Sequence, residues 1–387
     1  MKILIFEHKN FGIEDICETF NSFGYTYKVI STELIYNRIN KDFNQIFEKE
    51  ISDGYDCVFT FNYDPIVSTN CNIHNIPYIS YVYDSPLITL YSCTIINPCN
   101  YVFIFDKMQY NELKKAGINT VYYMPLAVNS KRLKRQLSSS LNIHSSYSSD
   151  ISFVGSMYNE KHNLFDKFKT TSPYTQGYLD GIMKAQLNVY GYYFIEELLT
   201  DNVLEEMRKA VPFTPNKDGV ETDTYVYAYY FIARKLAAME RYELLSALSD
   251  KFNVALYTSN PTDNMPYINN RGPVDYYNNM PYVFANSKIN LNISLRSIRS
   301  GIPLRCMDIM GCGGFLLSNY QEDFYEHFTP GQDMVLYDSK DDLINKCDYY
   351  LKHENERIQI AENGLGKIND YHTYDIRLRQ IFDIVFN

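Results

Sequence analysis

Several familiar features are missing from this sequence. Its 387 residues include no tryptophan and no Cys-x-x-Cys pair. The eight cysteines lack the spacing of a zinc site, so we interpret them as reduced, mostly buried thiols. The first apolar run, residues 3–6, is broken by Glu7, His8 and Lys9, which makes it too short for a signal segment or a membrane span. Together these absences predict a cytoplasmic protein.

The motifs of several large enzyme classes are also absent. There is no P-loop, no Gly-x-Gly-x-x-Gly after the first expected strand and no Gly-x-Ser-x-Gly. This argues against ATP hydrolysis, dinucleotide redox chemistry and esterase chemistry. No Asp-x-Asp pair is present to hold a divalent cation against a diphosphate, so we predict neither a metal nor a cofactor.

Basic residues are scarce as well. The formal net charge of -10 argues against a nucleic-acid partner, because such partners select basic surfaces that release counterions. The one basic run, residues 131–135, is short. We interpret it as a solvated segment near a domain boundary, and a peripheral membrane contact stays open as the alternative.

What the chain does contain is typical of a globular protein. Hydrophobic residues make up 45% and charged residues 21%, and the length predicts two domains facing a cleft. We interpret the 37 tyrosines as the composition of an AT-rich genome. A carbohydrate or protein surface lined by tyrosine is the alternative.

Short apolar segments alternate with helical ones along most of the chain, which predicts α/β domains with parallel sheets. We expect a first domain over residues 1–135, a Ser- and Asn-rich linker over 136–149 and a second domain over 150–370. The expected strands of the first domain lie at residues 2–6, 25–30, 57–61, 78–84, 101–106 and 120–125. Those of the second lie at residues 150–156, 253–259, 289–294, 313–319 and 334–339.

A long segment, residues 172–249, separates the first two strands of the second domain. Helical spacing in residues 178–199 and 227–249 predicts a helical insert, far longer than an ordinary crossover. The insert could simply buttress the sheet. An acceptor-binding cap and a dimerisation arm are the functional alternatives, so a homodimer stays open.

The most informative stretch is residues 296–314, RSIRSGIPLRCMDIMGCGG. Pro303 suits the first turn of a helix and the Gly pair at 313 and 314 suits its end, so a helix should begin at the crevice. Backbone N–H groups there, with Arg296, Arg299 and Arg305, could hold a diphosphate. Asp308, about one turn further, could accept hydrogen bonds from a ribose. The structural alternative makes these residues solvated surface charges.

A second candidate is the turn at Gly155 and Ser156, where small residues would let backbone amides approach a phosphate. As an isolated motif it describes most α/β turns. Lys161 and His162 follow it and could face the same crevice, although both also suit an ordinary helix surface.

Polar residues follow the expected strands of the first domain, at the sheet edge where such folds bind ligands. The acceptor-side candidates are Glu7, His8, Asn10, Asp84 and Asp106. If the reaction needs a general base, Asp84 is the first choice. The alternative for Asp84 is a turn residue that precedes Pro86.

Two parts of the chain resemble known families. Residues 59–86, 101–106 and 121–129 resemble the N-terminal domain of an uncharacterised bacterial group that is often joined to a glycosyltransferase domain. Residues 150–158, 300–343 and 371–381 resemble the glycosyltransferase domain of spore-maturation-protein-like enzymes, a family 1/4-like group. SGIPLRCMDIMGCGG is the specific match.

This resemblance implies a bacterial protein of GT-B architecture. Two Rossmann-like, doubly wound domains would face a cleft, and the final helix, residues 371–387, would return to the first domain. The resemblance also implies a nucleoside-diphosphate sugar as donor, a UDP-sugar first, and metal-independent transfer with retention favoured.

The resemblance assigns roles within the donor site. Gly155 and Ser156 fall at the turn that faces the donor phosphates, Gly301 lies in the donor loop, and Arg305 lies beside the ribose carboxylate. Related retaining enzymes carry two Glu separated by seven residues. Ser300 and Asp308 stand at those positions here, so the sugar-contacting carboxylate is missing.

The resulting hypothesis is a hexosyltransferase-type enzyme in which Asp84 and Arg305 carry catalysis. It would transfer a sugar to a hydroxyl of a glycan, a protein or a lipid carrier. One rival is a nucleotide-sugar epimerase or hydrolase of the same fold. The other is a catalytically degenerate nucleotide-binding scaffold.

Overall fold

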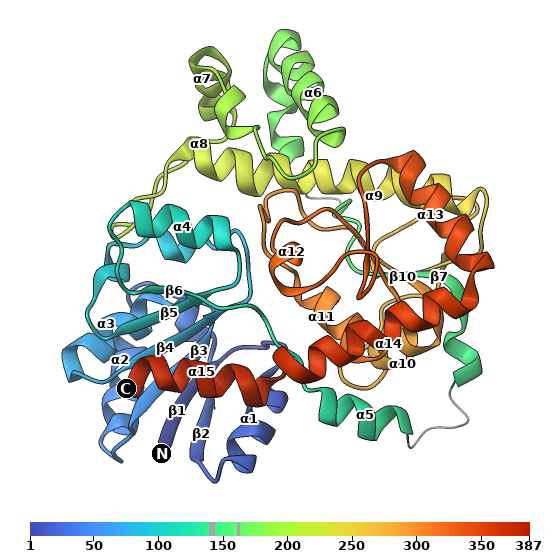
Figure 1. The fold of residues 1–387 in the computed structure, drawn as a ribbon. Coiled ribbons are helices and arrows are strands. Elements are labelled where there is room, and N and C mark those ends of the chain that lie inside the picture. The colour runs from blue at the N-terminus through green and yellow to red at the C-terminus, as the bar shows by residue number, and fades with distance from the viewer. Residues whose placement is uncertain (139–143, 161–162) are drawn as a thin grey trace. The chain divides into compact units, whose positions relative to one another are not determined.

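The computed structural model describes residues 1–138, 144–160 and 163–387, and Figure 1 shows the fold. Lys161, His162 and residues 139–143 of the predicted linker lie outside the described residues. The chain divides into two compact units. The first unit comprises Met1–Val128, Thr214–Thr222 and His372–Asn387, and the second comprises Asn129–Phe213 and Asp223–Tyr371.

The first unit is built around a parallel sheet. Its strands occur in the order β2 (Thr26–Ser31), β1 (Lys2–Glu7), β3 (Cys57–Phe61), β4 (Tyr78–Val82), β5 (Asn100–Ile104) and β6 (Val121–Tyr123). The helices of this unit are α1 (Ile13–Ser22), α2 (Lys41–Ile51), α3 (Pro65–His74), α4 (Lys107–Lys115) and α15 (Tyr374–Phe386). Every residue of β3 and β4 is buried, as expected for strands covered by helices on both faces.

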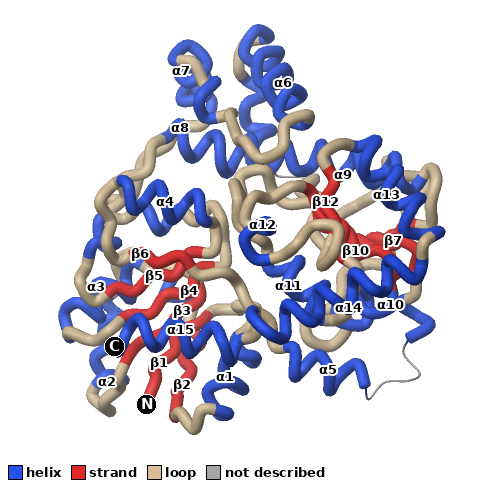
Figure 2. The backbone as a smooth tube through the Cα atoms, viewed as in Figure 1, coloured by secondary structure: helices blue, strands red, loops and turns tan. Residues whose placement is uncertain are grey.

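The second unit repeats this plan. Its strand order is β12 (Val335–Tyr337), β11 (Leu316–Asn319), β10 (Ser287–Asn292), β7 (Ser149–Val154), β8 (Val254–Tyr257) and β9 (Asn269–Asn270), with parallel pairing throughout. The helices outside the insert are α5 (Ser130–Ser138), α10 (Met280–Asn286), α11 (Leu304–Gly311), α12 (Phe324–His327), α13 (Lys340–Lys352) and α14 (Glu354–Tyr371). Figure 2 shows each sheet as a strand layer among helices. The predicted α/β class, with one doubly wound sheet in each half of the chain, is confirmed.

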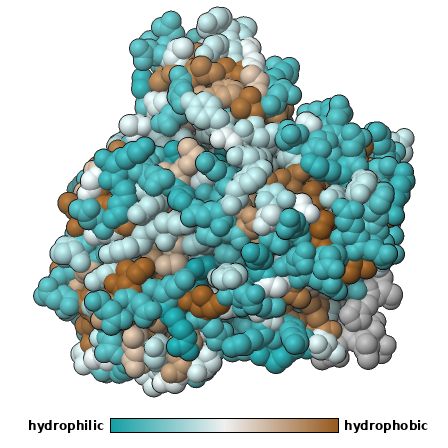
Figure 3. Space-filling model, viewed as in Figure 1, coloured by the Kyte–Doolittle hydropathy of each residue, from teal (hydrophilic) through white to brown (hydrophobic). Residues whose placement is uncertain are grey.

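The long insert is helical, as predicted. It contains α6 (Pro173–Leu187), α7 (Asp201–Ala210), α8 (Asp223–Val226) and α9 (Ala233–Ser249), and a π-helical segment over Tyr227–Ile232 leads into α9. The expected helix over residues 178–199 ends earlier, at Leu187, and the chain turns at Gly191 with φ of 76°. Hydrophobic residues gather over α6 and α7 in Figure 3. Tyr174 of α6, and Leu198 between the two helices, are exposed.

The structure divides the chain differently from the expected boundaries at one notable place. Thr214–Thr222, inside the predicted insert, belongs to the first unit. The Asp218 carboxylate accepts hydrogen bonds from Arg38 at 2.9 Å and from Ser92, and the Val220 N–H donates to the Tyr91 carbonyl at 2.8 Å. These contacts fix the segment onto the first unit, so the insert contributes to both units.

The end of the chain also belongs to the first unit. Thr373 caps α15 by accepting a hydrogen bond from the Ile376 N–H at 3.4 Å. The Val128 N–H donates to the His372 carbonyl at 3.0 Å, and Phe382 packs on Phe20 with ring centroids 5.9 Å apart.

None of the helices in the described ranges combines the length and apolarity needed to span a bilayer.

Candidate functional site

The helix predicted after the arginine-rich loop is present as α11. Pro303 lies at its N-cap, in extended backbone, and Gly313 ends it with φ of 72°. A Cβ at Gly314 would lie 2.7 Å from the Phe284 carbonyl oxygen, so the close approach of two backbones requires glycine there. The sequence signals at both ends of this helix therefore have a physical basis.

Arg305, in the first turn of α11, lies directly against the turn that follows β7. Its guanidinium is 5.1 Å from the Phe153 ring centroid, and a Cβ at Gly155 would come within 2.8 Å of its Nη2. Nη1 donates to Asn292 Oδ1 at 2.9 Å. Gly155 and Arg305, both predicted as donor-binding residues, are thus brought together, and a side chain at position 155 would displace the Arg305 guanidinium.

A second guanidinium lies beside Arg305 and was missed by the sequence reasoning. Arg241 of α9 is buried, donates to the carbonyls of Ser156 and Ile293, and stacks 5.2 Å from the same Phe153 ring. Burial lowers its pKa. Burial and the charge of Arg241 lower the pKa of Arg305 to about 10. At Arg305 the neighbouring positive charge adds to the effect of burial, and an anion bound there would offset that charge.

The turn after β7 is tied to the loop that follows β8. Asn260 Oδ1 accepts hydrogen bonds from Ser156 Oγ at 3.0 Å and from the Met157 N–H at 2.7 Å. Glu160 Oε1, 3.1 Å from Ser156 Oγ, is an alternative acceptor for the same hydroxyl proton. The hydroxyl of Ser156 is therefore engaged within the protein, and its role as a donor ligand stays a prediction.

Asp308 and Ser300 stand where the resemblance places the two donor-loop carboxylates. The Asp308 side chain is 5% exposed, and its Oδ1 accepts a hydrogen bond from the Tyr276 hydroxyl at 3.1 Å. Ser300 is buried, and its carbonyl accepts from the Asp323 N–H at 3.1 Å. Gly301 is buried and Arg299 partly exposed in the same loop. If Asp308 binds a ribose, its carboxylate would accept hydrogen bonds from both the ribose and the Tyr276 hydroxyl.

Arg296 has a different environment from Arg305. Its Nε and Nη2 donate to the two oxygens of the Glu240 carboxylate at 3.0 and 2.8 Å, and both side chains are buried. Its remaining donors reach the carbonyls of Leu187 and Val189, and its guanidinium is 3.5 Å from the Tyr190 ring centroid. The charge of Arg296 is thus compensated inside the second unit, and its predicted role in holding a diphosphate has no support in these contacts.

In the first unit, Asp84 is held by Asn62. Asn62 has φ of 61°, a left-handed conformation that Asn tolerates. Its Nδ2 donates to Asp84 Oδ2 at 2.9 Å, and its Oδ1 accepts from the N–H groups of Tyr83 and Asp84. Although Asp84 is exposed, nearby protein atoms displace enough water to raise the pKa of its carboxylate. The ends of β3 and β4 therefore position this carboxylate firmly.

The other acceptor-side candidates have unequal surroundings. Asp106 is fully buried and caps α4: its Oδ1 accepts from the Gln109 N–H at 3.3 Å and its Oδ2 from Ser85 Oγ at 2.9 Å. His8 packs edgewise on Tyr36 and lies 3.5 Å from Glu33. Glu7 ends β1, and Asn10 lies partly buried in the following loop. Asp106 has a clear structural role, whereas the others remain open to a ligand.

Asp64 is an acidic residue that was not singled out as a candidate. It follows β3, is 7% exposed, and burial raises the pKa of its carboxylate well above the usual value. The charges of Asp64, Asp84, Glu33 and Glu7 all contribute to the raised pKa of Tyr36, behind burial as the main cause. This edge of the first sheet is therefore acidic. Within the described residues, no group of three His, Cys, Asp or Glu side chains could hold a metal ion.

Comparison with known proteins adds a family match and a set of similar folds. Residues 237–383 match the model of a family described as glycosyl transferase-like. No curated protein sequence matches the chain.

Solved structures match over the whole length at low identity. Sucrose-phosphate synthase from Thermosynechococcus elongatus is 9% identical with a TM-score of 0.54, covering 100% of this chain and 99% of that one. A UDP-forming trehalose-phosphate synthase from Burkholderia xenovorans is 10% identical with a TM-score of 0.54, covering 100% and 98%. Anabaena HepE in complex with UDP and glucose is 11% identical with a TM-score of 0.50, covering 100% and 99%. The chain has the fold of GT-B glycosyltransferases.

Proposed function

We propose that this protein is a glycosyltransferase that moves a sugar from a UDP-sugar to a hydroxyl of a glycan, a protein or a lipid-linked acceptor. The observation that carries the proposal is the pair of guanidiniums, Arg305 and Arg241, on the two sides of the turn at Gly155. A buried and a half-buried cation beside a small-residue turn suit a diphosphate. The match of residues 237–383 and the similarity to Anabaena HepE, a protein solved in complex with UDP, support the choice of donor.

The proposed mechanism depends on stabilising the departing diphosphate. Arg305 and the first N–H groups of α11 would bind the phosphate oxygens as negative charge develops there. Asp308 would hold the ribose. Two cationic side chains could supply the countercharge that other transferases take from a metal, so we propose metal-independent transfer.

We propose that configuration at the anomeric carbon is retained. The leaving phosphate would then accept the proton of the acceptor hydroxyl, and no dedicated protein base is needed. Asp84, fixed by Asn62, would orient the acceptor by hydrogen bonding. The acceptor would thus bind the first unit and the donor the second.

A panel of UDP-sugars, incubated with the protein and analysed for released UDP with and without a chelator, tests this proposal. We expect slow, chelator-insensitive release of UDP from one donor, accelerated by the correct acceptor. Release that requires a divalent cation would contradict the metal-independent mechanism.

Ser300 favours one alternative, a nucleotide-binding protein without turnover, because the serine replaces the carboxylate expected to contact the sugar. Tight binding of UDP together with no release from any donor would select this alternative. Conversion of the sugar without an acceptor would instead select an epimerase or hydrolase.

A further inference from the structure

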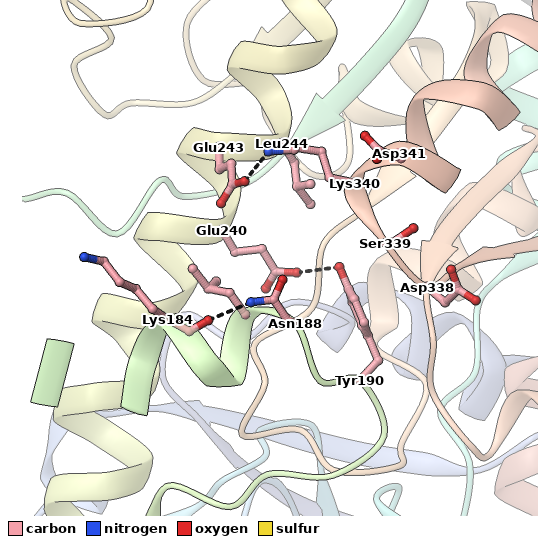
Figure 4. Close-up of a pocket in the computed structure, with 11 residues that line it drawn as sticks. Lys184, Asn188, Tyr190, Glu240, Glu243, Leu244, Asp338, Ser339, Lys340 and Asp341 are labelled. Atoms are coloured by element: carbon pink, nitrogen blue, oxygen red, sulfur yellow. Dashed lines mark hydrogen bonds and ion pairs between the residues drawn. The ribbon is translucent and has the colours of Figure 1, made fainter. Parts of the chain in front are cut away.

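A pocket of about 370 Å³ lies in the second unit. Figure 4 shows that its walls come from the end of α6, the middle of α9 and the start of α13. Its polar lining residues are Lys184, Asn188, Tyr190, Glu240, Glu243, Asp338, Ser339, Lys340 and Asp341. Neither Gly155, Arg305 nor Asp308 lines it. Its volume falls in the range of sites that hold small molecules.

Most of the charges in these walls are already compensated by the protein. Lys340 pairs with Glu243 at 2.5 Å, and Lys184 pairs with Asp180 at 2.7 Å. Glu240 is paired with Arg296 and also accepts a hydrogen bond from the Tyr190 hydroxyl at 3.2 Å. These four side chains therefore offer little to a charged ligand, whereas the carboxylates of Asp338 and Asp341 are available as hydrogen-bond acceptors.

The pocket instead offers many hydrogen-bonding groups of both kinds. Asn188 contributes an amide, Ser339 a hydroxyl and the two lysines N–H donors, while Asp338 and Asp341 contribute acceptor oxygens. A ligand that complements these groups needs closely spaced donors and acceptors of its own. A polyhydroxyl compound supplies both without a net charge. Saccharides have this chemistry.

The pocket also contacts the residues that hold the predicted donor loop. Glu240 faces the pocket with its carboxylate, which at the same time binds Arg296. Arg296 begins the loop that leads to α11, and its guanidinium lies on the Tyr190 ring. A ligand that binds Glu240 or Tyr190 would therefore act on the side chains that fix Arg296.

We propose that this pocket is an accessory saccharide-binding site, separate from the donor site and coupled to it through Glu240 and Arg296. It holds one or two sugar units. Because coupling between two sites is reciprocal, a bound saccharide changes the affinity for UDP and UDP changes the affinity for the saccharide. The site itself goes beyond the proposed function, and only the coupling rests on UDP binding.

Saturation-transfer NMR with glucose, galactose, mannose, N-acetylglucosamine and maltose tests the site. We expect one of them to bind the wild type, and Asn188→Leu and Asp338→Ala each to weaken its affinity by about tenfold, the effect of losing one hydrogen bond between protein and ligand. Asp370→Ala, an exposed position on α14, is the matched control and should bind as the wild type does. Failure of every saccharide to bind, or unchanged binding in both variants, overturns the site. Binding of a diamine such as putrescine in place of the sugars also overturns it.

Titration of the same samples with UDP separates this proposal from the proposed function. We expect the bound saccharide to shift the Kd for UDP at least about twofold, and Tyr190→Phe, which removes the hydroxyl that donates to Glu240, to reduce that shift. An unchanged Kd for UDP in the presence of bound saccharide overturns the coupling. Saccharide binding by a protein that does not bind UDP would refute the proposed function and leave the site intact.

Discussion

The carboxyl edges of the two sheets carry opposite charge. In the first unit, Asp64 and Asp84 follow β3 and β4, and both carboxylates have a raised pKa. In the second unit, Arg241 and Arg305 flank the turn after β7, and both guanidiniums have a lowered pKa. The same architecture thus supports two chemistries. The basic edge suits a diphosphate, and the acidic edge suits a hydroxyl nucleophile.

The largest expected effect is a loss of stability when Arg296 loses its partner Glu240. Glu240→Gln should lower the free energy of unfolding of the second unit by about 3–5 kcal/mol, because it leaves Arg296 charged and buried without its partner. Urea denaturation measures this change. The exposed pair of Lys352 and Asp348 is the matched control, and Asp348→Asn should cost less than about 1 kcal/mol. Equal effects of the two substitutions would show that Arg296 is not held as the structure indicates.

Substitution of Arg305 should instead weaken ligand binding, since we expect its charge to bind the UDP diphosphate. Arg305→Met should weaken UDP binding about 10- to 100-fold, the loss of one or two hydrogen bonds between charged groups. Calorimetric titration with UDP checks this. Arg379→Met, on the exposed face of α15, should bind UDP as the wild type does. An unchanged affinity of Arg305→Met for UDP would show that the basic edge does not form the donor site.

The acidic edge is tested by Asp84→Asn, which keeps the shape of the side chain and an acceptor oxygen. If configuration is retained, turnover should fall by no more than about tenfold, since Asp84 orients the acceptor and does not take its proton. A loss of about 10² to 10⁴ would show that Asp84 is a general base and that the reaction inverts. Asp53→Asn, an exposed position distant from this edge of the sheet, should have no effect on the rate.

The smallest effect is expected at Asp106, whose carboxylate serves the fold. Asp106→Ala should lower the free energy of unfolding of the first unit by about 1 kcal/mol through loss of the α4 cap, and Asp106→Asn should largely preserve it, because Asn caps helices equally well. Thermal denaturation distinguishes the two. A drop in acceptor affinity in Asp106→Asn, with stability unchanged, would place this residue in the acceptor site after all.

Much of this fold could be predicted from local sequence. Runs such as residues 57–61 are apolar except for Thr60, because strands of a covered parallel sheet are buried on both faces. Pro303 and the glycines at 313 and 314 marked the ends of α11 because each has a conformational requirement that few residues meet. The two-residue strand β9 was missed, since so short a segment has no detectable periodicity.

The site was harder to predict, because it depends on contacts between distant residues. Arg241 lies in a long helical insert, and its hydrogen bond to Ser156 spans 85 residues of sequence. The pairing of Arg296 with Glu240 spans 56. Neither contact leaves a local pattern. The only signal was a Glu–Arg pair at residues 240–241, within a helix that otherwise buries apolar side chains.

The central claim is that UDP binds the basic edge of the second unit. Hydrogen exchange of backbone amides, measured with and without UDP, tests it most directly. The account predicts slower exchange at the turn of residues 155–158 and at the start of α11, with no change in the loops that contain Asn62 and Asp84. Protection confined to the first unit, or no protection at either edge, would contradict it.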